Sequence, residues 1–476
     1  MDMKVRLIVF ILFILLIVSE SAGQKISAEE ARKDLMVFRT ALVEAHPGIY
    51  RFESRETFDS LFRSTEIALI DSISQTEFYR LLAPVVASVR CGHTKFFPEG
   101  FLDEDHLYRY FYGTDSLFPL KLMFSGKEGY LLDSYDQKTD IEKGTEILSI
   151  NDKPVSEILP FLFQNIVADG KVESSRYLEL NNFFPAYYAN LIESPGQFRL
   201  TLRKNNGEIE NVMVPATTLS EIKESEKNKP DNTERNFVLT FPDEKVALLK
   251  IKAFYPLSKE DNFKRFLKSS FKEINSRKIQ RLVIDLRDNE GGNDRWGALL
   301  FAQLTDKPFS YYESLKLPNK KLSFSEYAQM PKFYGLLKLL IRKDKDGGYK
   351  WTLHRNLKTR KPSRNPFMGE VFVLVNGFSF SVTSEFAAVV KATGRARLIG
   401  EETGGTYSGN NSGTFVIVTL PNSRLVLGIP MLGYYMSVPP IQPFDRGVLP
   451  DIEISPTIQQ AIKGEDIVLD KALYLD

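Results

Sequence analysis

The chain has 476 residues, of which 43% are hydrophobic and 26% are charged, and its formal net charge is +1. A chain of this length exceeds the size at which a single core stops growing, so we expect two or three domains. The near-neutral charge gives no indication of a nucleic acid or an anionic membrane as a partner.

The first residues have the composition of an export signal. Lys4 and Arg6 precede an apolar run over 7–18, and small residues follow at Ser21 and Gly23. The run is too short to span a bilayer comfortably. We therefore predict a cleaved signal peptide and an exported protein, periplasmic or extracellular, that is not stably inserted in a membrane. An uncleaved anchor is the alternative.

A helix is predicted directly after this segment. Ser27 suits an N-cap, and Glu29 and Glu30 place negative charge in the first turn, where the helix dipole favours it. Apolar residues then recur at helical spacing until the His-Pro-Gly turn at 46–48, which ends the helix.

A further helical pattern runs over 75–89. Gly92 is expected to terminate this helix, which would place His93 just past a helix end. Cys91 is the only cysteine, so an exported chain of this sequence has no internal disulfide. Cys91 is either a buried small hydrophobic residue, which we favour, or a nucleophile two residues before His93.

Short β-type runs replace the helical pattern between about 117 and 215. Examples are 130–132, 146–150 and 198–202. The segment 144–151 resembles the characteristic stretch of a PDZ domain, a module that binds peptide termini by adding a strand to a sheet edge.

The chain becomes α/β after a charged segment. Residues 219–236 predict a solvated linker. Apolar β-type runs then follow at 246–251, 282–286 and 371–375, with a helical pattern at 259–274 between the first two. Strands that alternate with helices imply parallel βαβ units.

A basic and aromatic segment, 308–367, lies between the second and third of these runs. We interpret it as an insertion that can serve as a substrate-side lid. The sequence contains no apparent internal repeat.

The first candidate site element is a glycine pair. An apolar strand ends near Leu286 and leads through a polar turn to Gly291 and Gly292. Adjacent backbone amides in such a turn can hold an anion. The alternatives are a tight connection without a ligand and a dinucleotide loop, although the Gly-x-Gly-x-x-Gly pattern is absent.

The second candidate element is a serine at a strand-to-helix junction. Ser381 follows a buried-type strand by a short turn and precedes an amphipathic pattern. Its own amide and that of Val382 can stabilise an oxyanion at the helix start. The alternative is that Ser379, Ser381 or Thr383 only caps the helix.

The third candidate element is a histidine, the usual base for a serine nucleophile. The chain holds four, and only His93 is flanked by glycine and a small polar residue. His46 precedes a proline in a helix-end turn, so a structural role is expected. His106 and His354 lie in polar surroundings typical of a surface.

The fourth candidate element is a pair of carboxylates, Asp445 and Asp451, that flank a turn near the chain end. Either one can orient an imidazole. The alternative, that both are ordinary surface turn residues, is favoured in isolation.

Together, five segments resemble the carboxyl-terminal-processing and tricorn-type family of serine peptidases, in the order in which that family carries them. They are Cys-Gly-His-Thr at 91–94, Asp-Leu-Arg-x-Asn-x-Gly-Gly at 285–292, Ser-Val-Thr-Ser-Glu-Phe-Ala at 381–387, Gly-Glu-Glu-Thr-Gly-Gly at 400–405 and Asp-Arg-Gly-Val-x-Pro-Asp at 445–451. The resemblance covers most of residues 30–470.

The resemblance implies an α/β fold: a crotonase-like (ClpP/crotonase-type) peptidase core with an N-terminal helical region and a PDZ-like β domain. The expected division is a signal peptide at 1–23, a helical region at 24–112, a PDZ-like domain at 113–218, a linker at 219–240, a core at 241–307 and 368–460, an insertion at 308–367 and a C-terminal helix or tail at 461–476.

The resemblance also implies roles for residues. Ser381 would be the nucleophile, and the amides of Val382 and of Gly291 or Gly292 would form the oxyanion hole. Many family members use a lysine as base, but no lysine occurs between residues 392 and 462.

The tricorn-like branch uses a histidine and an acid instead. His93 would then be the base and Asp445 the acid, with Glu401 and Asp451 as alternatives. The implied function is a serine endopeptidase that cleaves proteins or peptides through an acyl-enzyme, without a metal or organic cofactor. An inactive peptide- or ligand-binding relative is the alternative, and assembly into a homo-oligomer is open.

Overall fold

The computed structural model describes residues 25–97, 114–135, 140–227, 235–332, 334–345 and 347–475. The predicted signal peptide and His106 lie outside these residues. No helix within this described part of the chain has the length and apolar character needed to cross a bilayer.

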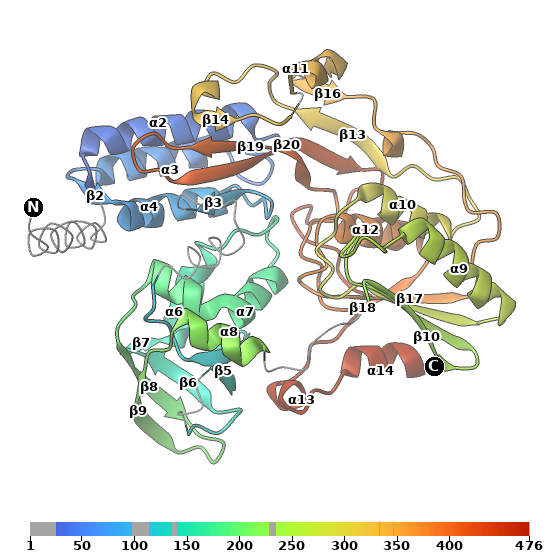
Figure 1. Ribbon diagram of the computed structural model, residues 1–476, viewed down its shortest axis with the longest axis horizontal. Helices are drawn as coiled ribbons and strands as arrows, with labels where there is room; N and C mark the ends of the chain where they lie inside the picture. Colours follow the sequence, from blue (N-terminus) through green and yellow to red (C-terminus); the bar gives the residue numbers. More distant parts are fainter. Residues whose placement is uncertain are drawn as a thin grey trace, which may run out of the picture.

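A six-stranded sheet forms the centre of the C-terminal half (Figure 1). Its strands, in spatial order, are β10 (Phe237–Asp243), β11 (Val246–Ile251), β12 (Arg281–Asp285), β17 (Glu370–Val375), β18 (Arg397–Gly400) and β21 (Ile452–Glu453). Only β10 is antiparallel to its neighbour. The three apolar runs predicted as strands are β11, β12 and β17, and parallel strands buried on both faces account for their lack of polar alternation.

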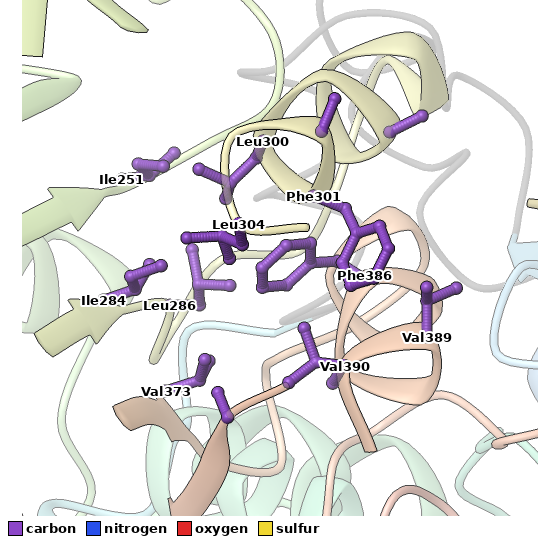
Figure 2. Close-up of a cluster of buried hydrophobic side chains, with 14 of the residues drawn as sticks. Ile251, Ile284, Leu286, Leu300, Phe301, Leu304, Val373, Phe386, Val389 and Val390 are labelled. Atoms are coloured by element: carbon purple, nitrogen blue, oxygen red, sulfur yellow. The ribbon is translucent and has the colours of Figure 1, made fainter. Parts of the chain in front are cut away.

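Helices cover both faces of this sheet. Three lie on one face and one on the other: α9 (Phe263–Ser276), α10 (Asp294–Ala302) and α12 (Val382–Thr393), and then α14 (Ile467–Tyr474). Figure 2 shows Phe301 of α10 and Phe386 of α12 in one buried cluster with Val373 of β17. Each fully buried side chain of this size contributes roughly 1.5–3 kcal/mol, so the cluster holds α12, which Ser381 precedes, firmly on the sheet.

The N-terminal helices pack on a second sheet of seven strands. These helices are α2 (Ala28–Ala45), α3 (Arg55–Ala68) and α4 (Gln75–Ser88). The sheet has the order β14 (Ala328–Gln329), β19 (Asn411–Thr419), β20 (Val426–Met436), β13 (Tyr312–Leu317), β16 (Tyr349–Trp351), β15 (Ile341–Lys343), with β3 (Lys95–Phe97) paired to β20. In Figure 1 the blue helices lie against the red strands β19 and β20. The segment 308–367 thus contributes β13, β14, β15 and β16 to this sheet.

The predicted boundaries of the first helix are confirmed. The Ser27 hydroxyl accepts the amide of Glu30, and the Glu30 carboxylate accepts the amide of Ser27 at 2.8 Å. This capping box satisfies two of the amides that a helix start leaves unpaired. The helix ends at Ala45, before the His-Pro-Gly turn.

The end of α4 differs from the prediction in one respect. Arg90, and not Gly92, adopts the left-handed conformation, with a φ of 53°. Gly92 is needed instead for close packing, because a Cβ at this position would lie 2.8 Å from Cζ of Phe380. His93 lies just past the helix end, as predicted.

A smaller antiparallel sheet forms a third unit. Its order is β4 (Leu120–Ser125), β5 (Glu128–Ser134), β6 (Glu146–Ile150), β8 (Gln197–Arg203), β9 (Ile209–Pro215), with β7 (Lys153–Pro154) paired to β6. Two helices, α6 (Val155–Phe163) and α7 (Ser174–Leu191), pack against it. The start of α7 reaches the core, where the Ser174 hydroxyl donates to the Glu402 carbonyl at 2.8 Å.

The segment predicted as a solvated linker is partly helical. α8 (Leu219–Lys227) occupies its first half, and Glu221 accepts the amide of Thr218 at 2.8 Å. Ile222 is buried in a small cluster with the β unit. The charged residues of the segment lie on the solvated face of α8, and Ile222 packs its other face against the β unit.

Candidate active site

Two side chains that are 288 positions apart meet at the junction of these units. His93 Nε2 lies 3.2 Å from Ser381 Oγ. His93 follows α4 of the N-terminal helices, and Ser381 lies between β17 and α12 of the α/β core. This is hydrogen-bond distance between a hydroxyl and an imidazole nitrogen.

Ser381 occupies an unusual backbone conformation. Its φ is 53° and its ψ is −121°, a region that non-glycine residues rarely adopt. The residue is the N-cap of α12, but its side chain makes no capping hydrogen bond. A strained turn that aims a serine outward from a strand-to-helix junction is a known feature of nucleophilic serines.

The neighbouring hydroxyls have structural partners or none. Ser379 Oγ donates to the Leu286 carbonyl at 2.8 Å, and Ser384 Oγ donates to the Ser379 carbonyl at 2.7 Å. Thr383 Oγ1 is buried and makes no hydrogen bond with the described residues. The interpretation of Ser381 as a simple cap therefore fails, since its hydroxyl faces the histidine instead.

Of the glycine pair, Gly291 lies against Ser381 and Gly292 lies against Phe254. A Cβ on Gly291 would come within 2.7 Å of Cβ of Ser381 and 2.8 Å of the Val382 nitrogen, so only glycine fits there. The Gly291 amide donates to Asn289 Oδ1 at 2.9 Å. Among the hydrogen bonds between described residues, none uses the amide of Gly292 or Val382. These two amides are therefore available as hydrogen-bond donors.

His93 is held in an apolar setting. Its ring stacks on Phe380 with centroids 4.5 Å apart. Burial lowers the pKa of His93 to about 3, and the charges of Lys95 and His46 act in the same direction. The ring is therefore neutral at physiological pH. Its Nδ1 is buried and has no hydrogen-bond partner among the described residues.

Asp169, between α6 and α7, is the acid next to this ring. One of its carboxylate oxygens lies within 4.8 Å of a ring nitrogen of His93. Its Oδ1 accepts the Gly92 amide at 2.7 Å. Burial raises the pKa of Asp169 to about 6, opposed by that amide and by the charge of Arg51. The sequence analysis did not identify Asp169, because an Asp-Gly pair in a separate β unit carries no signal that links it to His93.

Asp445, the acid favoured from the sequence, has other partners. Its Oδ2 lies 2.8 Å from Lys171 Nζ and 3.9 Å from Arg90 Nη1, while Oδ1 is buried without a partner in the described residues. No contact with His93 is recorded for it. Lys171 and Arg90 hold its carboxylate through opposite charge.

The two alternative acids are also engaged elsewhere. Asp451 pairs with Lys391 and accepts the Leu398 amide at 2.8 Å. Glu401 is stabilised by hydrogen bonds from Ser455 and from the Gly377 amide, although burial raises its pKa. Neither makes a hydrogen bond or ion pair with His93.

The turn that contains Asp445 holds a neighbouring loop in place. Arg446 donates two hydrogen bonds to Glu402, at 2.8 and 2.7 Å, and the Gly447 amide donates to the same carboxylate at 2.7 Å. This turn therefore fixes the 400–405 loop, which lies beside Ser381 through Gly405.

Of the two other described histidines, only His46 has the surroundings expected for it. His46 is buried, its Nδ1 accepts the Gly48 amide at 3.1 Å, and its Nε2 lies 3.1 Å from Thr94 Oγ1. Burial lowers its pKa to about 3, so it remains neutral. The surface position expected for His354 is wrong: its side chain is only 18% exposed, because it lies 3.1 Å from Asp294 and packs beside the rings of Tyr312 and Tyr434.

Cys91 is fully buried, and burial raises the pKa of its thiol to about 11. A thiol that stays protonated is a poor nucleophile, which favours the structural interpretation. Its sulfur nevertheless lies within 4.8 Å of both His93 and Asp169, and such a set of atoms can hold a metal ion.

A cavity of about 450 Å³ opens beside the site. Apolar and aromatic side chains from α4, β3 and α7 form most of its wall, together with Lys95 and Glu179. Gly92, Asp169 and Phe380 also line it, so it reaches the immediate surroundings of His93.

A hydroxyl on a strained strand-to-helix turn, facing a distant imidazole and backed by free amides, defines a serine–histidine site of the serine-hydrolase type. Residues 245–454 match the model described as Peptidase family S41, and this part of the chain belongs to that family. The family resemblance inferred from the sequence is thereby confirmed.

The chain is also similar to several solved structures. The chain is similar to mature CPAF, at 16% identity and a TM-score of 0.63, over 93% of this chain and 96% of that one. It is similar to mature CPAF complexed with lactacystin, at 17% identity and a TM-score of 0.62, over 93% and 97%. A weaker likeness is to the photosystem II D1 C-terminal processing protease, at 14% identity and a TM-score of 0.40, over 91% and 96%.

At these identities the likeness to CPAF shows a shared mixed α/β fold. No curated protein matches the chain.

Proposed function

We propose that the chain is a serine endopeptidase in which Ser381 is the nucleophile and His93 is the general base. The observation that carries this proposal is the 3.2 Å separation of Ser381 Oγ and His93 Nε2, made by a serine whose strained turn leaves its hydroxyl without any capping bond. Membership of peptidase family S41 gives protein or peptide chains as the substrate class.

In the proposed reaction, His93 Nε2 takes the proton of Ser381 Oγ as the oxygen attacks the scissile carbonyl carbon. The new C–O bond places negative charge on the carbonyl oxygen, which the amides of Val382 and Gly292 stabilise. His93 then gives its proton to the leaving amine as the C–N bond breaks. Water, activated by the same imidazole, hydrolyses the acyl-enzyme.

We assign the orienting acid to Asp169 rather than to Asp445. A base with a low pKa needs a nearby anion to stabilise its protonated form during the reaction. Asp169 is the carboxylate within 4.8 Å of the His93 ring, and both its Oδ2 and the ring's Nδ1 are buried and unpaired among the described residues. Asp445 instead pairs with Lys171 at 2.8 Å and with Arg90 at 3.9 Å.

The small antiparallel sheet β4–β9, with its helices α6 and α7, leads to a proposal about substrate binding. We propose that it is a PDZ-like domain of a crotonase-like peptidase, because its β6 arises from the PDZ-resembling segment and its sheet packs two helices. A fluorescent peptide with a free carboxyl terminus should then bind more tightly than its amidated form. Equal binding of both peptides counts against this assignment.

We also propose that the protein is exported, on the basis of the N-terminal sequence alone. Amino-terminal sequencing of the protein from its native cells should begin near residue 24. A mature protein that still begins at Met1 would contradict cleavage of the segment.

The activity is tested with an unstructured protein such as denatured casein. Ser381→Ala should reduce its hydrolysis by at least about 10³-fold, because acyl transfer loses its nucleophile. Thr383→Val is the matched control: it removes a hydroxyl two positions away that makes no hydrogen bond with any described residue, and it should retain activity. If the wild type and Ser381→Ala both fail to cleave, the inactive peptide-binding relative is the better description.

A further inference from the structure

Three side chains of the kinds that bind metals converge beside His93. Cys91 Sγ, a ring nitrogen of His93 and a carboxylate oxygen of Asp169 all lie within 4.8 Å of one another. Within the described ranges no other group of three histidine, cysteine or acidic side chains is as closely spaced. Two members come from one turn after α4, and the third comes from the loop between α6 and α7.

Two of these three side chains carry buried atoms that lack a partner. Neither His93 Nδ1 nor Asp169 Oδ2 makes a hydrogen bond with any described residue, and Asp169 is only 1% exposed. A buried polar atom without a partner is costly and is usually explained by a water, an ion or a functional role. Unpaired atoms on adjacent side chains indicate a site for a shared ligand.

The chemistry of the donors selects the kind of ligand. A thiolate, an imidazole and a carboxylate are the side chains that hold Zn²⁺, at about 2.0–2.3 Å, with three protein ligands and an open fourth position in reactive sites. Ligand atoms around a tetrahedral zinc ion are roughly 3.4 Å apart. Atoms already within 4.8 Å of one another reach that spacing through small side-chain rotations.

We propose that Cys91, His93 and Asp169 form a zinc site and that a bound zinc ion switches the peptidase off. The second half of this proposal rests on the proposed function, whereas the first half does not.

Zinc would inhibit the peptidase because a neutral His93 ring carries only one proton, and metal binding determines which ring nitrogen holds it. His93 Nε2 is at Ser381, so the metal takes the lone pair of Nδ1. A neutral ring has a single proton, which must then lie on Nε2. That nitrogen can donate to Ser381 Oγ but cannot accept its proton, so the serine stays protonated. In the metal-free state the proton lies on Nδ1, facing Asp169, and Nε2 is free to act as the base.

The surroundings of the cluster fit a metal site. The Gly92 amide fixes Asp169 through Oδ1 at 2.7 Å, which leaves Oδ2 for the metal. Binding releases the thiol proton of Cys91 to solvent and involves no electron transfer. The cavity beside the site, which Asp169 lines, offers an access route.

The site is tested by titrating the metal-free full-length chain with Co²⁺, a spectroscopic substitute for zinc. Cys91 is the only cysteine, so a thiolate-to-cobalt absorption band can come from no other residue. We expect one equivalent to bind, Zn²⁺ to abolish the band, and Cys91→Ala to lack it. Loss of a residue that only hydrogen-bonds a metal ligand weakens metal binding by up to ~100-fold. Asp169→Asn removes a ligand itself and should therefore weaken Co²⁺ binding by more than this.

Ser381→Ala should bind Co²⁺ with wild-type affinity, so the metal site can be judged even if the chain proves not to be a peptidase. Absence of a band in the wild type, or an unchanged affinity in Asp169→Asn, would overturn the site.

The switch is tested by the rate at which a fluorophosphonate labels Ser381, measured with and without stoichiometric Zn²⁺. Labelling of the wild type should fall at least tenfold and recover on chelation, whereas Cys91→Ala, compared with itself, should be insensitive to zinc. Binding of the metal with an unaltered labelling rate would overturn the switch.

Discussion

At the scale of single residues, the site depends on one histidine whose basicity is set by its surroundings. Burial lowers the pKa of His93 to about 3, which keeps Nε2 free to accept a proton but makes the protonated ring unfavourable. An anion beside Nδ1 offsets that cost while the ring is charged. Asp169 lies within 4.8 Å of the ring and is held by the Gly92 amide, so we expect it to be the positioning acid.

The two candidate acids can be separated by their effects on turnover. Asp169→Asn should lower kcat by about 10²–10⁴, because the amide cannot stabilise the protonated imidazole. Asp445→Asn should lower kcat less than about tenfold, since Lys171 and Arg90 are its partners. The measurement is kcat of both variants on one peptide substrate. A larger loss of kcat in Asp445→Asn than in Asp169→Asn would show that Asp445, the acid favoured from the sequence, orients His93.

The pH dependence of kcat/KM should also report Asp169. Burial raises its pKa to about 6, so this carboxylate loses its charge as the pH falls through that value. Activity should therefore fall below about pH 6, and the fall should disappear in Asp169→Asn. An identical acid limb in the variant would show that another group controls it.

At the scale of elements, α12 packs on the six-stranded sheet through its apolar side chains and is tied to the seven-stranded sheet through a buried carboxyl in its first turn. The Tyr312 hydroxyl donates to Glu385 Oε2 at 2.6 Å, and Asn410 Nδ2 donates to Oε1 at 2.9 Å. Tyr312 belongs to β13, so the bond connects the helix that follows Ser381 to the seven-stranded sheet. Burial, with a smaller contribution from Asp294, raises the pKa of Glu385 to about 8.

This raised pKa predicts a pH-dependent stability. The folded chain binds the Glu385 proton more tightly than the unfolded chain, so this contribution to stability is full below about pH 4.5 and is lost as the pH rises to about 8. Glu385→Gln keeps the acceptor oxygen but cannot ionise. Its Tm relative to wild type should increase from pH 5 to pH 8 and then level off. A difference that is constant over this range would contradict the assignment.

The elements around Ser381 could be predicted from the sequence because each has a local signal. The two adjacent central strands, β12 and β17, are unbroken apolar runs, and the glycine pair follows the first and the serine turn follows the second. The first helix could be predicted to the residue from its capping pattern. By contrast, α8 was hidden in a charged segment whose single buried isoleucine gives no periodic pattern.

The pairing of side chains across units could be predicted only in part. His93 was identifiable because few histidines compete with it, and the family resemblance linked it to Ser381. Asp169 was not, since it lies 77 positions from Gly92 in a different unit and its role arises only from packing. The choice of Asp445 followed from its place in a motif, and that motif instead clamps the 400–405 loop through Arg446 and Glu402.

At the scale of the whole molecule, the site is assembled from three units. His93 belongs to the N-terminal helical unit, Asp169 to the β unit and Ser381 to the α/β core. The pairing of β3 with β20 and the packing of Gly92 on Phe380 hold the first unit against the core. The distance between base and nucleophile is therefore a property of how the units fit together, and not of any one of them.

Gly92→Ala tests this dependence. The new Cβ would lie 2.8 Å from Phe380 and would separate the turn that carries His93 from the core. A displacement of about 1 Å should lower kcat/KM by about 10²-fold, with a stability loss of about 1–3 kcal/mol. Gly196→Ala is the matched control, because nothing lies within 4 Å of its new Cβ. Equal kinetics in the two variants would contradict the account.

The central claim is that Ser381 is made nucleophilic by a distant imidazole. The most direct measurement is the rate of covalent labelling by a fluorophosphonate, with the modified residue located by peptide mass spectrometry. We predict labelling of wild type at Ser381, none in Ser381→Ala, and a rate in His93→Gln that is at least about 10²-fold lower. Equal labelling of the wild type and Ser381→Ala, or an unchanged rate in His93→Gln, would contradict the claim.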